Sequence, residues 1–315
     1  MEEKKRKGNR VSELCLGTVQ FGMKYGINNK TGQPSEEACF EMMDLAISRG
    51  IQVIDTARAY GTAEERVGRY LSYRGLQGKI DVISKLCPNV IEEGEKDIYS
   101  VVRRELEGSL GRLGVTRLKG YLLHTPEYVY QEKIVEALFR LKEEGLTENI
   151  GVSIYGMEEG YEAIRRGMDY VQLPYSVLDQ RGEQTGFIEE AKKVGIKVFT
   201  RSAFLQGLFL MDKEELPETL KRAEPYLKHF EELIEKYKVN KIELLLQFVK
   251  AKQEIDYLVF GVDSKEQLIE NIEKFELEKE MDCEMMEDIR TYFCKVEDSV
   301  ILPSLWANGK KVEKN

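Results

Sequence analysis

The sequence has few of the residues that build disulfide frameworks or metal centres. It contains five cysteines, an odd number, and no two of them have Cys-x-x-Cys spacing. It contains only two histidines, His124 and His229. We therefore expect no disulfide scaffold and no bound metal, and a metal-dependent hydrolase is disfavoured. This cysteine usage is typical of a reducing compartment, so we expect a cytoplasmic protein.

Long apolar runs and a positive net charge are also absent. No run is long enough to cross a bilayer, and the charged N-terminal segment Met-Glu-Glu-Lys-Lys-Arg-Lys-Gly lacks the apolar core of a signal peptide. The formal net charge of −9 argues against a broad nucleic-acid-binding surface. Hydrophobic residues make up 42% of the 315 positions, which is enough for a sizeable core. We therefore expect a small-molecule partner, and neither nucleic acid nor a membrane.

Eight short apolar runs alternate with amphipathic segments along the chain. The runs are 14–18, 51–56, 80–85, 120–124, 150–153, 170–173, 196–200 and 257–262. They are typical of parallel strands that are buried on both faces. Several of the intervening segments have helical spacing and end at a glycine just before the next run.

This rhythm predicts an α/β fold, a (β/α)8 TIM barrel that forms a single domain over 1–315. An open doubly wound sheet is the alternative. We expect the ends, 1–10 and 307–315, to be flexible. An extra helical stretch around 216–237 precedes the expected helix around 242–249, and it predicts an insertion on the active-site face.

Polar residues end three consecutive apolar runs. Asp55, Lys85 and His124 occupy these positions, and Tyr60 lies in the loop after Asp55. Because reactive groups of this fold lie at the carboxyl ends of its strands, we expect the four side chains to meet. Taken one at a time, the four residues have ordinary structural explanations: a turn aspartate, a loop aromatic, a surface lysine and a structural histidine. Their combination is what points to chemistry.

Carbonyl reduction gives these four residues distinct tasks. The reaction needs a hydride and a proton, and tyrosine is a weak acid with an ordinary pKa of about 10. A lysine beside Tyr60 would lower the pKa of its phenol, and Asp55 would hold Lys85 in place. His124 would orient or polarise the carbonyl oxygen. Proton donation by Tyr60 would contribute roughly 10²–10⁴ in rate.

Two capping boxes predict helix starts near this set of residues. Thr62 and Glu65 form the first, directly after Tyr60. Ser264 and Gln267 form the second, after the eighth run. A helix N-terminus favours an anion, so a ligand phosphate is expected near the second. No Gly-x-Gly-x-x-Gly follows any run.

Four segments of the sequence resemble segments of the aldo-keto reductase superfamily: Leu16-Gly17-Thr18, Asp55-Thr56-Ala57-Arg58-Ala59-Tyr60-Gly61, Ile83-Ser84-Lys85 and Leu122-Leu123-His124. The resemblance covers nearly the whole chain. It implies the (β/α)8 barrel and a catalytic tetrad of Tyr60, Lys85, Asp55 and His124. It also implies an NAD(P)H-dependent oxidoreductase that reduces an aldehyde or ketone to an alcohol, with the hydride coming from nicotinamide and the proton from Tyr60.

The resemblance also implies a set of cofactor-binding residues: Gly17, Thr18, Asp55, Ser153, Gln172, Tyr175, Arg201, Ser202, Phe204, Gln206, Gly207, Gly261, Asp263, Gln267 and Asn271. Ser153 and Gln172 would hold the carboxamide, and Tyr175 would stack under the nicotinamide. The segment 200–207 would face the pyrophosphate, and 261–271 the adenosine. The family implies NADP. However, Gln267 stands where many NADPH-specific members have arginine, and Asp263 adds a negative charge, so NAD stays open.

Two other functions remain open on the same barrel. Lys85 could form a Schiff base in an aldolase. The protein could also be a reductase-like sensor of nicotinamide redox state that turns over slowly. Among substrates, a sugar-like or other polar carbonyl compound is expected. The predicted pocket walls are Val19, Phe21, Tyr25 and Trp306.

Overall fold

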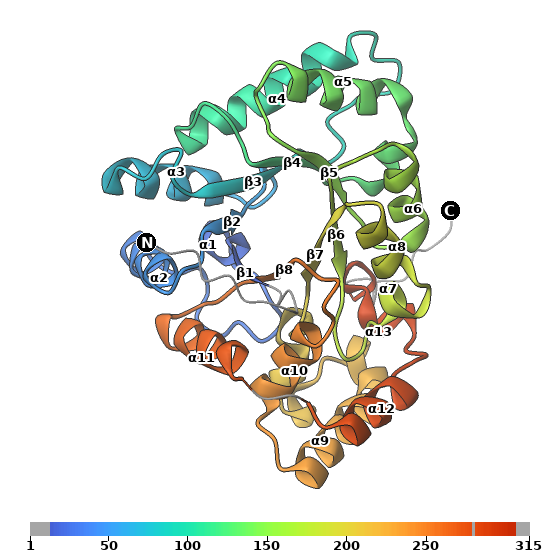
Figure 1. The fold of residues 1–315 in the computed structure, drawn as a ribbon. Coiled ribbons are helices and arrows are strands. Elements are labelled where there is room, and N and C mark those ends of the chain that lie inside the picture. The colour runs from blue at the N-terminus through green and yellow to red at the C-terminus, as the bar shows by residue number, and fades with distance from the viewer. Residues whose placement is uncertain (1–12, 279–280, 307–315) are drawn as a thin grey trace, which may run out of the picture.

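A computed structural model describes residues 13–278 and 281–306 of the chain. At its centre, eight parallel strands follow one another in chain order and close into a barrel (Figure 1). This arrangement confirms the predicted (β/α)8 TIM barrel and excludes the open sheet. The strands are β1 (Glu13–Gly17), β2 (Val53–Asp55), β3 (Asp81–Leu86), β4 (Gly120–Leu123), β5 (Ile150–Ser153), β6 (Tyr170–Pro174), β7 (Lys197–Arg201) and β8 (Tyr257–Phe260). The ends that were expected to be flexible, 1–10 and 307–315, lie outside the described residues.

Helices surround the barrel and cover its outer face (Figure 1). They are α1 (Val19–Gly22), α2 (Glu36–Ser48), α3 (Ala63–Arg74), α4 (Ile98–Leu113), α5 (Glu132–Glu143), α6 (Met157–Arg165), α7 (Arg181–Gln184), α8 (Phe187–Lys193), α9 (Glu224–Tyr237), α10 (Lys241–Lys250), α11 (Lys265–Glu276), α12 (Cys283–Tyr292) and α13 (Asp298–Ile301). In the two described ranges, no helix combines the length and the apolar character that a membrane crossing needs.

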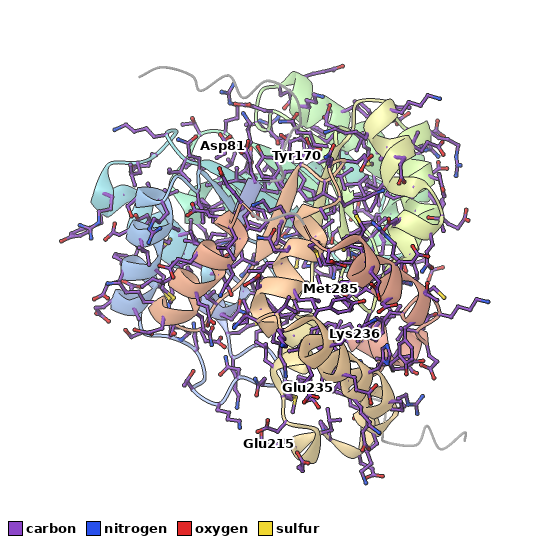
Figure 2. All side chains as sticks on the ribbon, turned by 60° about the horizontal axis from the view of Figure 1, so that its bottom comes forward. Asp81, Tyr170, Glu215, Glu235, Lys236 and Met285 are labelled. Carbon is purple, nitrogen blue, oxygen red and sulfur yellow. The ribbon has the colours of Figure 1, made fainter. Side chains whose placement is uncertain are left out.

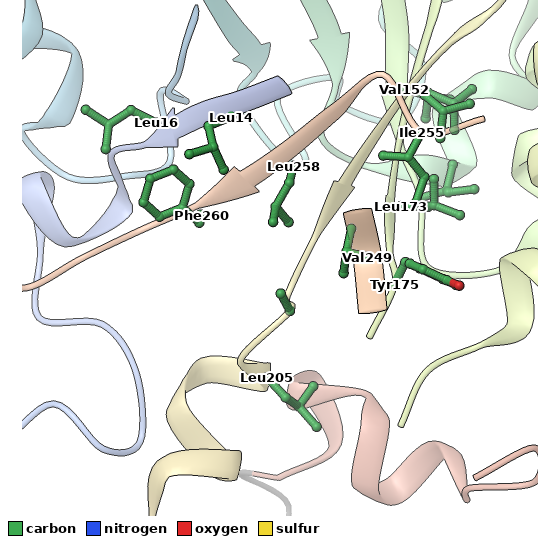
Figure 3. Close-up of a cluster of buried hydrophobic side chains, with 14 of the residues drawn as sticks. Leu14, Leu16, Val152, Leu173, Tyr175, Leu205, Val249, Ile255, Leu258 and Phe260 are labelled. Atoms are coloured by element: carbon green, nitrogen blue, oxygen red, sulfur yellow. The ribbon is translucent and has the colours of Figure 1, made fainter. Parts of the chain in front are cut away.

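Alternation along the strands divides the apolar core into two parts. Leu14 and Leu16 of β1 face outward, where they lie beside Leu258 and Phe260 of β8 (Figure 3). The residues between them face inward, because successive side chains of a strand point to opposite sides. A separate interior cluster consists of Cys15, Val53, Ile83, Leu122, Tyr170, Phe199 and Val259. The barrel is therefore a packed core and has no open channel through its middle.

The inward positions become polar at the carboxyl ends of the strands. Two residues after Val53, Ile83 and Leu122 of the interior cluster stand Asp55, Lys85 and His124. The same spacing carries β7 from Phe199 to Arg201. Since these residues share the inward direction of the cluster below them, the barrel collects its polar side chains at one mouth.

The opposite end of the barrel carries structural ion pairs. The ammonium of Lys119 lies 2.9 Å from Glu148 and 3.5 Å from Asp81, at the start of β3. The Lys197 ammonium lies 6.0 Å from the ring centre of Tyr170. Asp81 and Tyr170 lie near each other at one end of the view in Figure 2. These contacts close the amino-terminal end of the barrel, away from the polar mouth.

The predicted extra helix is α9, between β7 and the expected helix α10. Phe230 of α9 packs on Phe209, with ring centres 4.8 Å apart, so α9 supports the segment that follows β7. Lys236 of α9 donates to Asp288 of α12 at 2.7 Å, on the side of α9 that faces α12 (Figure 2). The sequence predicted that this stretch would lie on the active-site face. In the structure, α9 packs against the segment that follows β7 and contributes no side chain to the cavity described below.

Candidate active site

A cavity of about 550 Å³ lies at the carboxyl ends of the strands. This volume is within the range of roughly 300–1,000 Å³ that ligand-binding pockets occupy. Asp55, Tyr60 and His124 all line it, as the strand-end pattern predicted. The residues given by the resemblance that also line it are Gly17, Thr18, Ser153, Gln172, Arg201, Ser202, Phe204, Gln206, Gly207, Gly261, Asp263, Gln267 and Asn271.

Lys85 lies directly behind this cavity and joins two of the lining residues. Its side chain is fully buried, and its ammonium donates to Asp55 Oδ1 at 2.6 Å. The same ammonium lies 3.0 Å from the Thr56 carbonyl oxygen and 3.4 Å from the Tyr60 hydroxyl. Gln172 donates to the other carboxylate oxygen of Asp55 at 2.8 Å. The lysine is thus fixed in place, with its charge turned toward the Tyr60 hydroxyl.

Two glycines set the position of the Tyr60 loop. A Cβ on Gly22 would overlap the carbonyl oxygen of Tyr60, and a Cβ on Gly61 would overlap the carbonyl oxygen of Gly22. Gly61 also has a φ of +57°, which glycine adopts at little cost. The backbones of the first and second βα loops therefore cross in direct contact. This crossing fixes Tyr60 against the strand that carries Asp55.

The helix behind Tyr60 begins differently from the prediction. Thr62 precedes α3, but its side chain makes no capping hydrogen bond. Its hydroxyl instead lies 3.4 Å from the Gly22 carbonyl oxygen and accepts from Gln33 at 3.3 Å. The predicted Thr62–Glu65 capping box is therefore wrong. The threonine hydroxyl joins the two crossing loops, and this leaves it unable to cap its own helix.

Burial dominates the acid–base behaviour of Tyr60. It raises the pKa of the phenol, and the cation of Lys85 opposes the rise without reversing it. The sequence led us to expect a lowered pKa. The direction of the Lys85 effect was right, but the net direction was wrong because the loss of hydration outweighs it. Burial also pulls the pKa of Lys85 down, but the charges of Asp55 and Tyr60 outweigh burial and hold it above the ordinary value. Tyr60 and Lys85 therefore both keep their protons at neutral pH.

His124 lies beside Tyr60 in the cavity wall as a neutral ring. The two ring centres are 5.6 Å apart and the planes are nearly perpendicular. Burial, with the nearby charges of Lys85 and Arg201, lowers the pKa of His124 to about 3. The buried Nδ1 atom has no hydrogen-bond partner among the described residues. A neutral imidazole with a free polar atom can hold a ligand oxygen without adding charge to the site.

The segment after β7 forms one wall of the cavity. Ser202, Leu205 and Gln206 have positive φ values of 69°, 45° and 55°, which non-glycine residues rarely adopt. The carbonyl oxygen of Gln206 accepts from the backbone N–H of Ile27 at 3.1 Å. The 202–207 segment is thereby tied to the first βα loop, and both border the cavity.

The far end of the cavity lies at the start of α11. Ser264 caps this helix by accepting from the Gln267 N–H at 3.3 Å, as predicted. The Gln267 side chain accepts from the N–H of Asp263, one residue earlier than the capping-box pattern requires. Asn29 donates to Asp263 at 2.9 Å and so connects this end to the first βα loop.

Tyr175 requires a correction, because the structure places it outside the cavity. It lies two residues after the outward-facing Leu173 and shares its direction, among the core side chains drawn in Figure 3. Its ring stacks on Phe248 of α10 at 5.3 Å, and its hydroxyl donates to Glu183 at 2.7 Å. A residue held in this way does not reach a ligand at the barrel mouth.

Of the four residues predicted to form the pocket walls, two line the cavity and two lie outside it. Val19 and Tyr25 line the cavity, whereas Phe21 is fully buried in the core. Trp306 is buried and donates from its indole to the Val300 carbonyl oxygen at 3.1 Å. The residues that line the cavity near the end of the described chain are its neighbours Pro303 and Ser304.

Sequence reasoning missed several residues that line the cavity. They are Gln20, Met23, Gly26, Asn28, Asn29, Ala59, Tyr155, Leu210, Ile242, Val259, Phe260, Pro303 and Ser304. Several of them, such as Met23, Asn28 and Ala59, belong to loops, which carry no periodic signal. Tyr155 is an exception, because it lies two residues after Ser153 and the inward spacing could have found it.

Comparisons with known proteins agree with this fold. A family model described as "Aldo/keto reductase family" matches residues 13–292 of this chain. An uncharacterized oxidoreductase of Bacillus subtilis, YrpG, is 28% identical, over 90% of this chain and 94% of its own length. The NADH-specific methylglyoxal reductase of Escherichia coli is 25% identical, over 83% of this chain and 89% of its own length.

One solved structure adds evidence on the fold alone. The aldo-keto reductase AKR11C1 from Bacillus halodurans, in its holo form, superposes with a TM-score of 0.71. It is 24% identical, and the match covers 89% of this chain and 92% of that one. The barrel described above is therefore also found in an experimentally determined structure.

Proposed function

We propose that this chain, a member of the aldo/keto reductase family of oxidoreductases, reduces an aldehyde or ketone to an alcohol with a nicotinamide cofactor. The observation that carries the proposal is the placement of the Tyr60 hydroxyl. It lies in the cavity wall with the Lys85 ammonium 3.4 Å behind it, and Asp55 holds that lysine at 2.6 Å. A protonated tyrosine backed by a fixed cation suits the delivery of a proton to a developing alkoxide.

The residues of the cavity fit a nicotinamide dinucleotide. Ser153 and Gln172 present a hydroxyl and a carboxamide side by side at the mouth, 3.5 Å apart, which suits the carboxamide of the nicotinamide. The start of α11, with Gln267 and Asn271 beside it, suits the adenosine end. When bound, this cofactor supplies the hydride that the protein's own side chains cannot provide.

In this proposal the protein handles only the proton and the developing charge. As the bound cofactor's hydride would reduce the carbonyl carbon, the carbonyl π pair would move to oxygen, and the Tyr60 hydroxyl would give its proton to that oxygen. Lys85 stabilises the tyrosinate left behind, and a proton from solvent restores the phenol. The neutral His124 holds the carbonyl oxygen through a ring N–H and so orients the substrate.

The charges at the adenosine end favour NADH, whereas the sequence resemblance favoured NADP. Asp263 and Glu270 line the cavity there, while Lys265 pairs with Glu41 at 3.6 Å, outside the lining. A carboxylate suits the free ribose 2′-hydroxyl of NADH and repels the 2′-phosphate of NADPH. One similar protein carries the description NADH-specific, which supports the same choice.

The position of Lys85 argues against the Schiff-base aldolase. An imine requires a neutral amine that can reach the substrate carbon. Lys85 is fully buried behind Asp55 and Tyr60 and does not line the cavity. The charges around it also keep its pKa above the ordinary value, so the amine stays protonated.

The test separates an enzyme from a redox sensor. We expect the purified protein to oxidise NADH in the presence of small polar aldehydes and ketones, with sugars and methylglyoxal in the panel. Tyr60→Phe should retain cofactor binding, measured by fluorescence, and lose about 10²-fold or more of kcat. Tight cofactor binding with negligible wild-type turnover across the panel would favour the sensor. Near-normal rates in Tyr60→Phe would refute the assignment of the proton donor.

A further inference from the structure

Arg201 brings a second cation to the reaction end of the cavity. Of the described residues that line the cavity, it is the only lysine or arginine. It ends β7, two residues after Phe199 of the interior cluster, so its side chain is directed into the barrel mouth. Its charge contributes to the lowered pKa of His124 and opposes the rise in the pKa of Tyr60. The guanidinium therefore lies near the two groups that would face the carbonyl.

The contacts of Arg201 orient the guanidinium without neutralising it. It donates to the Ile154 carbonyl oxygen at 3.1 Å and to the Ser202 hydroxyl at 3.4 Å. Its central carbon lies 4.5 Å from the ring centre of Tyr155. Within the described ranges, no carboxylate forms an ion pair with it. By contrast, the part-buried Arg112 pairs with Glu64 at 2.6 Å.

A guanidinium has five N–H donors, and these two contacts leave three of them for a ligand. The planar fork matches the oxygens of a carboxylate or phosphate, and such charge-assisted bonds are the strong ones. The Ile154 and Tyr155 contacts turn Arg201 toward the end of β5, away from the start of α11, where the adenosine end of the cofactor is expected. An anionic group near the substrate carbonyl is the partner that this arrangement lacks.

We propose that Arg201 binds an anionic group, a carboxylate or a phosphate ester, on the carbonyl substrate. The inference rests on the proposed function, since it concerns the substrate of the same site. It changes the role that the sequence resemblance gave to this arginine, from cofactor to substrate recognition. The expected substrates are acidic aldehydes and ketones, including acidic sugars.

Matched substrate pairs test this role. The pairs are succinic semialdehyde with butyraldehyde, glucuronate with glucose, and glyceraldehyde 3-phosphate with glyceraldehyde, all at one fixed ionic strength. We expect the wild-type protein to favour the anionic member of at least one pair. Arg201→Met should lower kcat/KM for that member by about 10- to 100-fold, the loss typical of a hydrogen bond to a charged group. Its kcat/KM for the neutral member and its KM for NADH should change less than about threefold.

Two further variants sharpen the comparison. Arg201→Lys keeps the charge without the planar fork, so it should recover part of the selectivity. Arg165→Met removes one positive charge from the exposed face of α6, outside the cavity, and should leave selectivity unchanged. Equal losses for both members of every pair would overturn the proposal. A raised KM for NADH with unchanged selectivity would return Arg201 to the cofactor.

A binding measurement keeps this inference separate from the proposed function. If no carbonyl compound is turned over, the reductase proposal fails, but the anion site can still be tested. Succinate should raise the thermal midpoint of the NADH-loaded wild-type protein, and it should have no such effect on Arg201→Met. An identical response of the two proteins to succinate would show that Arg201 holds no anion.

Discussion

Removing Lys85 should reveal how tightly stability and chemistry are combined at the barrel mouth. The side chains of Lys85 and Asp55 are 0% and 3% exposed, and their ion pair measures 2.6 Å. Lys85→Met would leave the Asp55 carboxylate buried, with Gln172 as the remaining side-chain donor among the residues that the structure describes. Breaking a buried pair in this way costs about 3–5 kcal/mol of unfolding free energy, because a charge stays behind without its partner. That loss is a large fraction of the roughly 5–15 kcal/mol that keeps a protein folded.

The double variant Lys85→Met/Asp55→Asn separates the two contributions. It removes the orphaned charge as well, so it should recover most of the lost stability in urea unfolding curves. It should not recover activity, because no cation then stands behind Tyr60. We expect both variants to lose about 10²–10⁴ in kcat/KM for reduction. The reasoning would be refuted if the single variant lost less than about 1 kcal/mol, or if the double variant were no more stable than the single one.

Three further predictions follow from the geometry of the site. Gly22→Ala should disrupt the Tyr60 loop and abolish reduction. Gly111→Ala is the control: the added Cβ lies on helix α4 and meets no atom within 4 Å, so this variant should be stable and active. Turnover and thermal midpoints of the two variants check this. The kcat/KM for reduction should stay level between about pH 5 and 9, because the pKa of His124 is lowered to about 3 and that of Tyr60 is raised; a pH profile with an inflection near 6.5 would contradict it. Gln267→Arg should lower KM for NADPH about 10-fold with little effect on NADH, and initial rates with both cofactors will show whether it does.

The barrel could be predicted because its signal is repetitive. Each apolar run ends at the same edge of the barrel, so strand ends alone placed Asp55, Lys85 and His124 together. The lengths were less predictable: the run 51–56 contains a strand of only Val53–Asp55. Apolar character reports burial, whereas strand bounds depend on the partners that a neighbouring strand supplies.

The parts of the site that escaped prediction depend on contacts between distant segments. The hydroxyl of Thr62 faces Gly22 from another loop, and no local pattern shows that this contact replaces the helix cap. The surroundings of Arg201 come from β5, a different strand. Tyr175 is a different case, because the two-residue alternation from Leu173 was visible in the sequence and indicates an outward side chain. For Tyr175, the two-residue periodicity predicts the direction of the side chain correctly, and the family resemblance does not.

The contact between Gly22 and Gly61 also has a practical consequence for redesign. It divides the first βα loop into a part that can be varied and a part that cannot. Met23, 39% exposed and lining the cavity, can be randomised to change substrate range. The two glycines should be left untouched in any such library, because side chains there would displace the backbone that carries the proton donor. A grafted loop must keep the same crossing point.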